Sequence, residues 1–166
     1  MILIPSALHS LLTQLTCREG APHTAILTSS AQSGGSIISS HSVPPSQIIE
    51  PFQKPYRAGL DRPDREDHEG EEEEEDGDDE EVRVGMYAAL AVGTWNEQRG
   101  NTQVSSRSVE PLTLETEVGR ISVISIAKGN FLLILAGTEI TPWKVLDKKI
   151  RAAEEYLREP LSKISA

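Results

Sequence analysis

The chain has few of the residues that would define a site immediately. One of its 166 residues is cysteine, and 4% are aromatic. A single thiol, Cys17, excludes an internal disulfide and a cysteine-based zinc site, and it fits a reducing compartment. No uncharged apolar run approaches the roughly 20 residues that cross a bilayer, and no basic segment precedes the first apolar run. We therefore expect neither a transmembrane helix nor a secretory signal.

Basic residues are also scarce: 16 Lys and Arg stand against 26 Asp and Glu, for a net charge of −10. Fourteen of the acidic residues fall between positions 64 and 81, so the rest of the chain is close to neutral. This balance leaves no broad basic surface for nucleic acid. It also makes direct contact with an anionic membrane surface unfavourable, so we expect membrane association only through partners.

Residues 42–81 differ in composition from the rest of the chain. Only seven of these forty residues are apolar, and five of the ten prolines lie here. Such a segment buries too little surface to offset its ordering entropy, and its acidic run lacks the spaced carboxylates of a calcium loop. We predict that 42–81 is a disordered insert, and that 1–41 and 82–166 together form one domain.

Helix and strand patterns alternate along the two flanking parts. Leucines spaced as on one helix face follow Pro5, and a second such stripe follows Pro142, with Pro160 expected to kink or end that helix. Five segments have strand length and pattern: 23–28, 36–40, 111–116, 120–127 and 131–136. The last is apolar throughout, which places it in the middle of the sheet, whereas Pro111 favours an edge.

A further helix is predicted over 82–99, and it is the most informative element. Thirteen consecutive residues, 84–96, carry no charge and are apolar on nearly every side. One side of such a helix can cover the sheet, and the other then needs a partner; the alternative is a central helix covered within the monomer. The candidate partner surface combines this helix with the predicted edge strand: Met86, Leu90, Gly93, Trp95, Leu112 and Leu114.

The order helix–strand–strand–helix–three strands–helix predicts an α/β sandwich. In this order the chain resembles the roadblock/dynein light-chain family, and most closely its Ragulator roadblock subunits in a fungal-type version with a long acidic insert. Four segments carry the resemblance: PSALHSLLTQ, AVGTWNEQRGN, EVGRISVISIAKGNFLLIL and KIRAAEEYLREPLSKI. The resemblance implies a roadblock-type α/β/α sandwich with a five-stranded, mainly antiparallel sheet and three helices.

The resemblance also implies a function as a scaffold. A Ragulator-like subunit would form a heterodimer with a second roadblock-domain protein, held by a lipid-anchored wrapping subunit. The complex would recruit Rag-type small GTPases, and regulate their nucleotide exchange, in amino-acid signalling to the TOR kinase complex. Its place would be the cytosolic face of the late endosome, lysosome or vacuole. Other roadblock roles stay open: a dynein-associated homodimer or a regulator of a small GTPase.

A third possibility, a small enzyme with an unrecognised site, has little to support it. The four histidines have neither a partner four residues away nor a cysteine companion. Gly34–Gly35 lacks the Lys-Ser/Thr of a phosphate loop, and no serine lies in a G-x-S-x-G turn. We therefore expect no catalytic residue, no cofactor and no metal.

Overall fold

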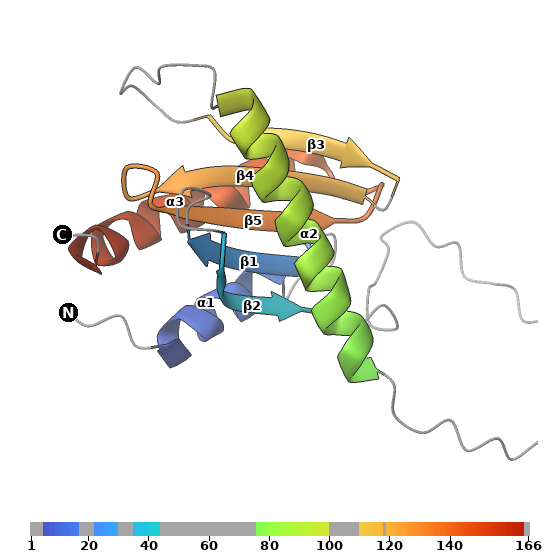
Figure 1. The fold of residues 1–166 in the computed structure, drawn as a ribbon, viewed down its shortest axis with the longest axis horizontal. Helices are drawn as coiled ribbons and strands as arrows, with labels where there is room; N and C mark the ends of the chain where they lie inside the picture. The colour runs from blue at the N-terminus through green and yellow to red at the C-terminus, as the bar shows by residue number, and fades with distance from the viewer. Residues whose placement is uncertain are drawn as a thin grey trace, which may run out of the picture.

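The computed structural model describes residues 5–16, 22–29, 35–43, 76–99, 110–117 and 119–164. These residues form three helices and five strands in the predicted order, and Figure 1 shows how they are arranged. Their bounds are α1 Pro5–Thr16, β1 Thr24–Ser29, β2 Ile37–Ser42, α2 Asp76–Arg99, β3 Leu112–Thr116, β4 Gly119–Ile126, β5 Phe131–Gly137 and α3 Trp143–Ile164. Most of the predicted insert, 44–75, lies outside the described residues.

The strands form one sheet in the order β2-β1-β5-β4-β3, and every neighbouring pair is antiparallel. The continuously apolar β5 lies in the centre between β1 and β4, as its sequence predicts, because both of its faces are covered. The strand that follows Pro111, β3, lies at one edge, where a missing N–H disrupts no ladder. The predicted fold class is confirmed.

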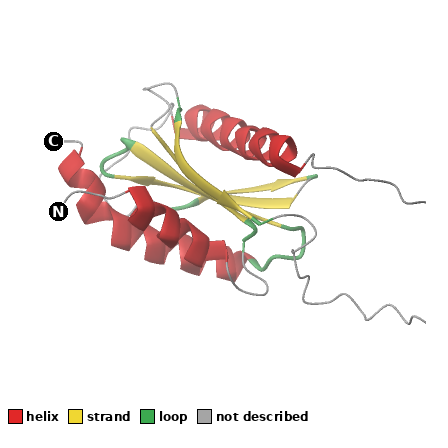
Figure 2. Ribbon diagram, turned by 90° about the horizontal axis from the view of Figure 1, so that it is seen from below, coloured by secondary structure: helices red, strands yellow, loops and turns green. Residues whose placement is uncertain are grey.

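The helices lie on both faces of this sheet. Figure 2 shows α1 and α3 together on one face and α2 alone on the other. The alternation of each strand sends its side chains into two separate cores. On β5, Leu133 and Leu135 pack towards α1 and α3, while Leu132 and Ile134 pack towards α2.

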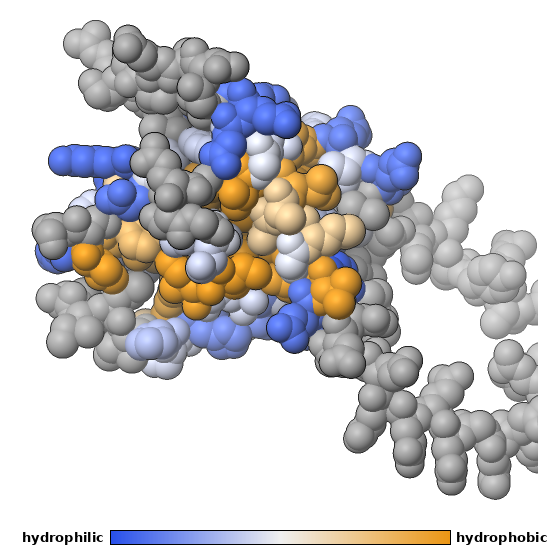
Figure 3. All heavy atoms as spheres, viewed as in Figure 1, coloured by the Kyte–Doolittle hydropathy of each residue, from blue (hydrophilic) through white to orange (hydrophobic). Residues whose placement is uncertain are grey.

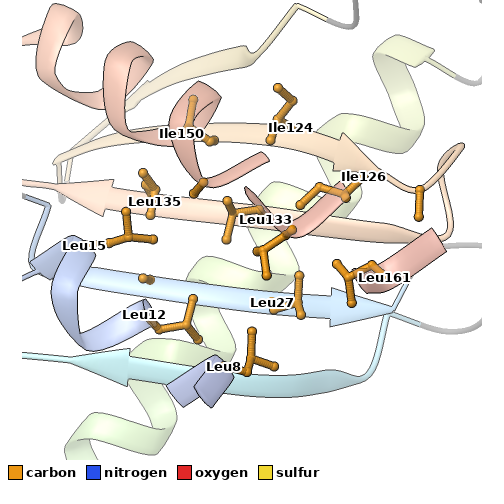
Figure 4. Close-up of a cluster of buried hydrophobic side chains, with 14 of the residues drawn as sticks. Leu8, Leu12, Leu15, Leu27, Ile124, Ile126, Leu133, Leu135, Ile150 and Leu161 are labelled. Carbon is orange, nitrogen blue, oxygen red and sulfur yellow. The ribbon is translucent and has the colours of Figure 1, made fainter. Parts of the chain in front are cut away.

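The core beneath α1 and α3 is drawn in Figure 4. The predicted stripe of α3 is buried in it: Leu146, Ile150, Ala153 and Leu157. Pro160 does not end this helix, because α3 continues to Ile164. Leu161 explains the difference, since it is buried in the same core and its packing stabilises the turn that follows the proline.

The predicted boundaries of the insert need correction at both ends. Ser42 belongs to β2, and α2 begins at Asp76 rather than at Val82. The early start has a physical reason: the added segment is acidic, and negative charge is favoured at a helix N-terminus by the aligned peptide dipoles. The acidic run therefore contributes its last residues to a helix.

Candidate partner interface on helix α2

Helix α2 has one face on the sheet. Its buried side chains recur at helical spacing: Val84, Tyr87, Ala88 and Ala91. They pack on the apolar side chains of β1, β4 and β5 that point to this side. Trp95, one turn after Ala91, is partly buried against the same core.

The opposite face of α2 is apolar and open. The term outer strip is used here for the exposed residues Val82, Met86, Ala89, Leu90 and Gly93. Val82 is 71% exposed, Met86 40% and Leu90 41%. A Cβ added at Gly93 would meet no atom within 4 Å, so another backbone can approach closely there. Figure 3 shows apolar surface over α2 on this side of the molecule.

The six predicted interface residues fall into two neighbouring groups. Met86, Leu90 and Gly93 lie together in the outer strip. Trp95, Leu112 and Leu114 are partly buried hydrophobic residues around the core beneath α2. Both groups therefore lie on the α2 side of the sheet.

Sequence reasoning missed two residues of the outer strip, Val82 and Ala89. Val82 was assigned only as the first helical residue, although it precedes Met86 by one helical turn. Ala89 lies between Ala88 and Leu90, and its type does not distinguish a buried position from an exposed one. Extending the i, i+3, i+4 spacing backwards and forwards from Met86 would have found both.

β3 supplies the second part of the candidate surface. Its partner on one side is β4, and no described strand pairs with its other side. Its exposed side chains include a single charge, Glu115, which lies 3.4 Å from Arg120 Nε on β4. An open edge presents backbone donors and acceptors to which a strand of another chain can pair.

The first part of α2 is fixed to the sheet by a polar cluster. Arg83 Nη2 donates to Ser42 Oγ at 2.9 Å and to the carbonyl oxygen of Val43 at 3.4 Å. Ser42 Oγ lies 2.9 Å from Thr24 Oγ1, which lies 2.8 Å from His23 Nδ1. These bonds join α2, β2 and the start of β1, so they hold the outer strip in a defined orientation. The sequence gives no sign of this cluster, because its members are far apart along the chain.

Burial shifts the pKa values of two side chains at this cluster, His23 and Tyr87. Burial, and secondly the Arg83 guanidinium, lower the pKa of His23 from 6.5 to about 4. His23 is therefore neutral near pH 7. Burial also raises the pKa of Tyr87, whose ring centroid lies 5.7 Å from that of His23. Both shifts favour the uncharged side chain, as expected where a protein interior excludes water.

Trp143, the first residue of α3, is partly buried against the core of α1 and α3. The Arg120 guanidinium lies 5.0 Å from the centroid of its ring, a cation–π geometry. The same arginine donates from Nη1 to the carbonyl oxygen of Thr141 at 2.9 Å. Trp143 thus fixes the start of α3 to β4, on the side away from the outer strip.

Groups that could do chemistry are sparse in the described part of the chain. No three His, Cys, Asp or Glu residues described by the structure lie close enough to hold a metal ion. Among the same residues, no helix is both long and apolar enough to cross a membrane. Cys17, Gly34 and His68 lie outside the described residues.

Comparisons with known proteins give a fold. No family model and no curated protein matches the sequence. Among solved structures, a roadblock/LC7 domain from Streptomyces avermitilis has a TM-score of 0.52 at 15% identity, over 92% of this chain and 96% of that chain. MglB of Myxococcus xanthus has a TM-score of 0.49 at 12% identity, over 99% of this chain and 91% of that chain. The helices, the sheet order and the first of these similarities together show that the chain has the roadblock/LC7 fold.

Proposed function

We propose that the protein is a non-catalytic adaptor that pairs with a second roadblock-type domain through the outer strip of α2 and the edge strand β3. One observation carries the proposal. Helix α2 already covers its side of the sheet with one face, yet its other face is apolar and exposed over about three turns, from Val82 to Gly93. A solvent-facing helix surface normally carries polar or charged side chains.

The pairing would combine two kinds of interaction. Burial of Met86 and Leu90 against a partner helix would release water from apolar surface, at about 25 cal/mol for each Å² buried. Pairing along β3 would add backbone hydrogen bonds and fix the register. Helix packing without strand pairing would leave the orientation of the two chains relative to each other undefined. Helix packing and strand pairing together therefore give specificity.

The resemblance of four segments to Ragulator roadblock subunits supports a more specific role. The partner is then a second roadblock-domain protein in a heterodimer, and a lipid-anchored wrapping subunit holds both on the cytosolic face of the late endosome, lysosome or vacuole. The assembly recruits Rag-type small GTPases for amino-acid signalling to the TOR kinase complex. The chain itself contacts the membrane only through these partners.

Affinity purification of the tagged full chain from its native source tests this role. We expect the wild type to co-purify with a second roadblock-domain protein, a lipidated subunit and Rag-type GTPases. Leu90→Asp places a charge in the outer strip and should remove all three. The matched control is Tyr156→Asp, because Tyr156 is a 69% exposed aromatic residue on α3, on the other face of the sheet. It should keep every partner.

Two results would contradict the proposal. Recovery of dynein chains, or of no partner at all, would exclude the Ragulator-like role. Wild-type recovery of partners by Leu90→Asp, with the variant folded by circular dichroism, would show that α2 is not the interface.

A further inference from the structure

Two histidines that are far apart in the sequence meet at the edge of the sheet opposite β3. His9 lies on α1, and His41 lies thirty-two positions later on the edge strand β2. Their ring centroids are 5.6 Å apart, with an angle of 68° between the ring planes. The pair lies away from the outer strip and from β3, so the proposed pairing with a roadblock-type domain does not use it.

A hydrogen bond determines which nitrogen of His41 carries a lone pair. Thr16 Oγ1 lies 2.9 Å from the carbonyl oxygen of Thr13 and 2.9 Å from His41 Nδ1. A hydroxyl group has one proton, and a carbonyl oxygen can only accept. Both contacts are hydrogen bonds only if Thr16 donates to Thr13 and His41 Nδ1 donates to Thr16. The proton of the neutral ring is then on Nδ1, so Nε2 keeps a lone pair.

The surroundings of His41 also favour a bound cation. Burial, and secondly the neighbouring His9, lower the pKa of His41, whereas the Glu80 carboxylate on α2 opposes this shift. His41 is therefore neutral near pH 7, and neutral imidazole is the form that binds metal ions. Glu80 is close enough to influence His41, so its negative charge would also attract a cation bound at this ring.

The distance between the two rings suits one metal ion between them. Zn²⁺ binds an imidazole nitrogen at about 2.0–2.1 Å, which places the ring centre about 3.2 Å from the ion. At a tetrahedral angle, two such rings have centroids about 5.2 Å apart. The observed 5.6 Å is close to this value, and His9 is exposed, so its side chain can move to adjust the distance. An edge-to-face contact of two rings has a similar distance, and a zinc titration separates the two interpretations.

We propose that His9 and His41 bind a divalent transition-metal ion that prefers imidazole ligands, such as Zn²⁺, at the β2 edge of the sheet. Two protein ligands are fewer than the four of a closed structural zinc site. The remaining positions are therefore open to water or to a ligand from another molecule. The bound ion would join α1 to the edge strand and stabilise this side of the sheet.

Calorimetric titration of the purified full chain with ZnCl₂ tests the site. The buffer contains about 10 mM Mg²⁺ to occupy the carboxylates of the acidic run, because Mg²⁺ prefers oxygen ligands whereas Zn²⁺ accepts imidazole nitrogen. We expect one Zn²⁺ to bind per chain. His9→Asn and His41→Asn should each raise the dissociation constant at least tenfold. The matched control is His68→Asn, in the predicted insert, which should bind Zn²⁺ as the wild type does.

NMR spectra of the wild type make the test independent of any effect of a substitution on the fold. Zn²⁺ should shift the ring-proton resonances of His9 and His41 and leave those of His23 unchanged, because His23 is buried in the polar cluster. Zn²⁺ should also raise the melting temperature of the wild type but not that of His9→Asn.

Three results would overturn the inference. The first is that the wild type binds no Zn²⁺ in the presence of Mg²⁺. The second is that the double variant His9→Asn/His41→Asn binds Zn²⁺ as tightly as the wild type does. The third is that Zn²⁺ binds but leaves the resonances of both His9 and His41 unshifted.

Discussion

Two alanines on α2 allow the two faces of this helix to be tested with the same substitution. Ala91 is fully buried against the sheet, whereas Ala89, two residues earlier, is exposed in the outer strip. Ala91→Asp should destabilise the fold, and Ala89→Asp should leave the fold intact while breaking partner binding. The substituted residue and the helix are the same, so only the environment differs.

The expected magnitudes differ by several-fold. An unpaired carboxylate at position 91 would be buried among apolar side chains, at a cost of about 4 kcal/mol. At position 89 the isolated chain loses only helix propensity, about 0.6 kcal/mol. For a domain of this size, 1 kcal/mol lowers the melting temperature by about 4 °C. The predicted losses are therefore about 16 °C for Ala91→Asp and about 2 °C for Ala89→Asp.

Partner affinity should show the opposite ranking: among folded molecules, Ala89→Asp should weaken partner binding more than Ala91→Asp does. A carboxylate at position 89 would be desolvated in the contact, which should cost about 3 kcal/mol, or about a hundredfold in the dissociation constant. Calorimetric unfolding and titration against the native partner measure the two quantities. The two-face assignment is refuted if Ala89→Asp unfolds the chain as readily as Ala91→Asp, or if it binds the partner with wild-type affinity.

Other predictions concern the polar cluster and the turns. The folded state lowers the pKa of His23 from 6.5 to about 4. Between these pH values the unfolded chain therefore binds more protons than the folded chain does. The free energy of unfolding should be highest above pH 6.5 and should fall as the pH drops towards 4. The loss of unfolding free energy should be on the order of 3 kcal/mol, measured by denaturant titrations across this pH range. His23→Gln should make the free energy of unfolding less dependent on pH. An equally steep dependence in the variant would contradict the assignment of this effect to His23. Gly119→Ala should destabilise the fold by more than Gly129→Ala, because both positions have positive φ but only at Gly119 would a Cβ overlap the carbonyl oxygen of Gly137. Equal losses of melting temperature in the two variants would contradict this reasoning.

Much of the fold follows from local pattern. The central place of β5 could be predicted because a run such as FLLILA has no polar face to turn to water. The edge position of β3 was indicated by Pro111, and the buried stripe of α3 by the spacing of Leu146, Ile150 and Leu157. In each case the residues that carry the information are close together in the sequence.

The features that escaped prediction depend on contacts between distant residues. Pro160 was expected to kink or end α3, yet the helix continues past it, where the burial of Leu161 in the core stabilises the next turn. The acidic run was assigned wholly to the insert, although its last residues lie in α2. No local pattern could show that Arg83 reaches Ser42, forty-one positions away.

The partner interface itself stays a prediction, but the exposed apolar strip of α2 on which it depends follows from a local pattern. The absence of charge over 84–96 indicated a helix covered on two sides, and the exposed strip agrees with one side left for a partner. Residue type alone does not separate the inner from the outer alanines: Ala89 and Ala91 differ only in their angle around the helix, so the spacing from Met86 was the one local signal that could distinguish them.

Hydrogen–deuterium exchange of the full chain, alone and in the complex purified from its native source, tests the central claim most directly. If a partner covers the outer strip and pairs with β3, amides of β3 and of the exposed part of α2 should gain protection in the complex. Protection on the opposite face, in α3, should change less. The account is contradicted if the complex protects α3 or α1 while β3 and α2 exchange as they do in the free chain.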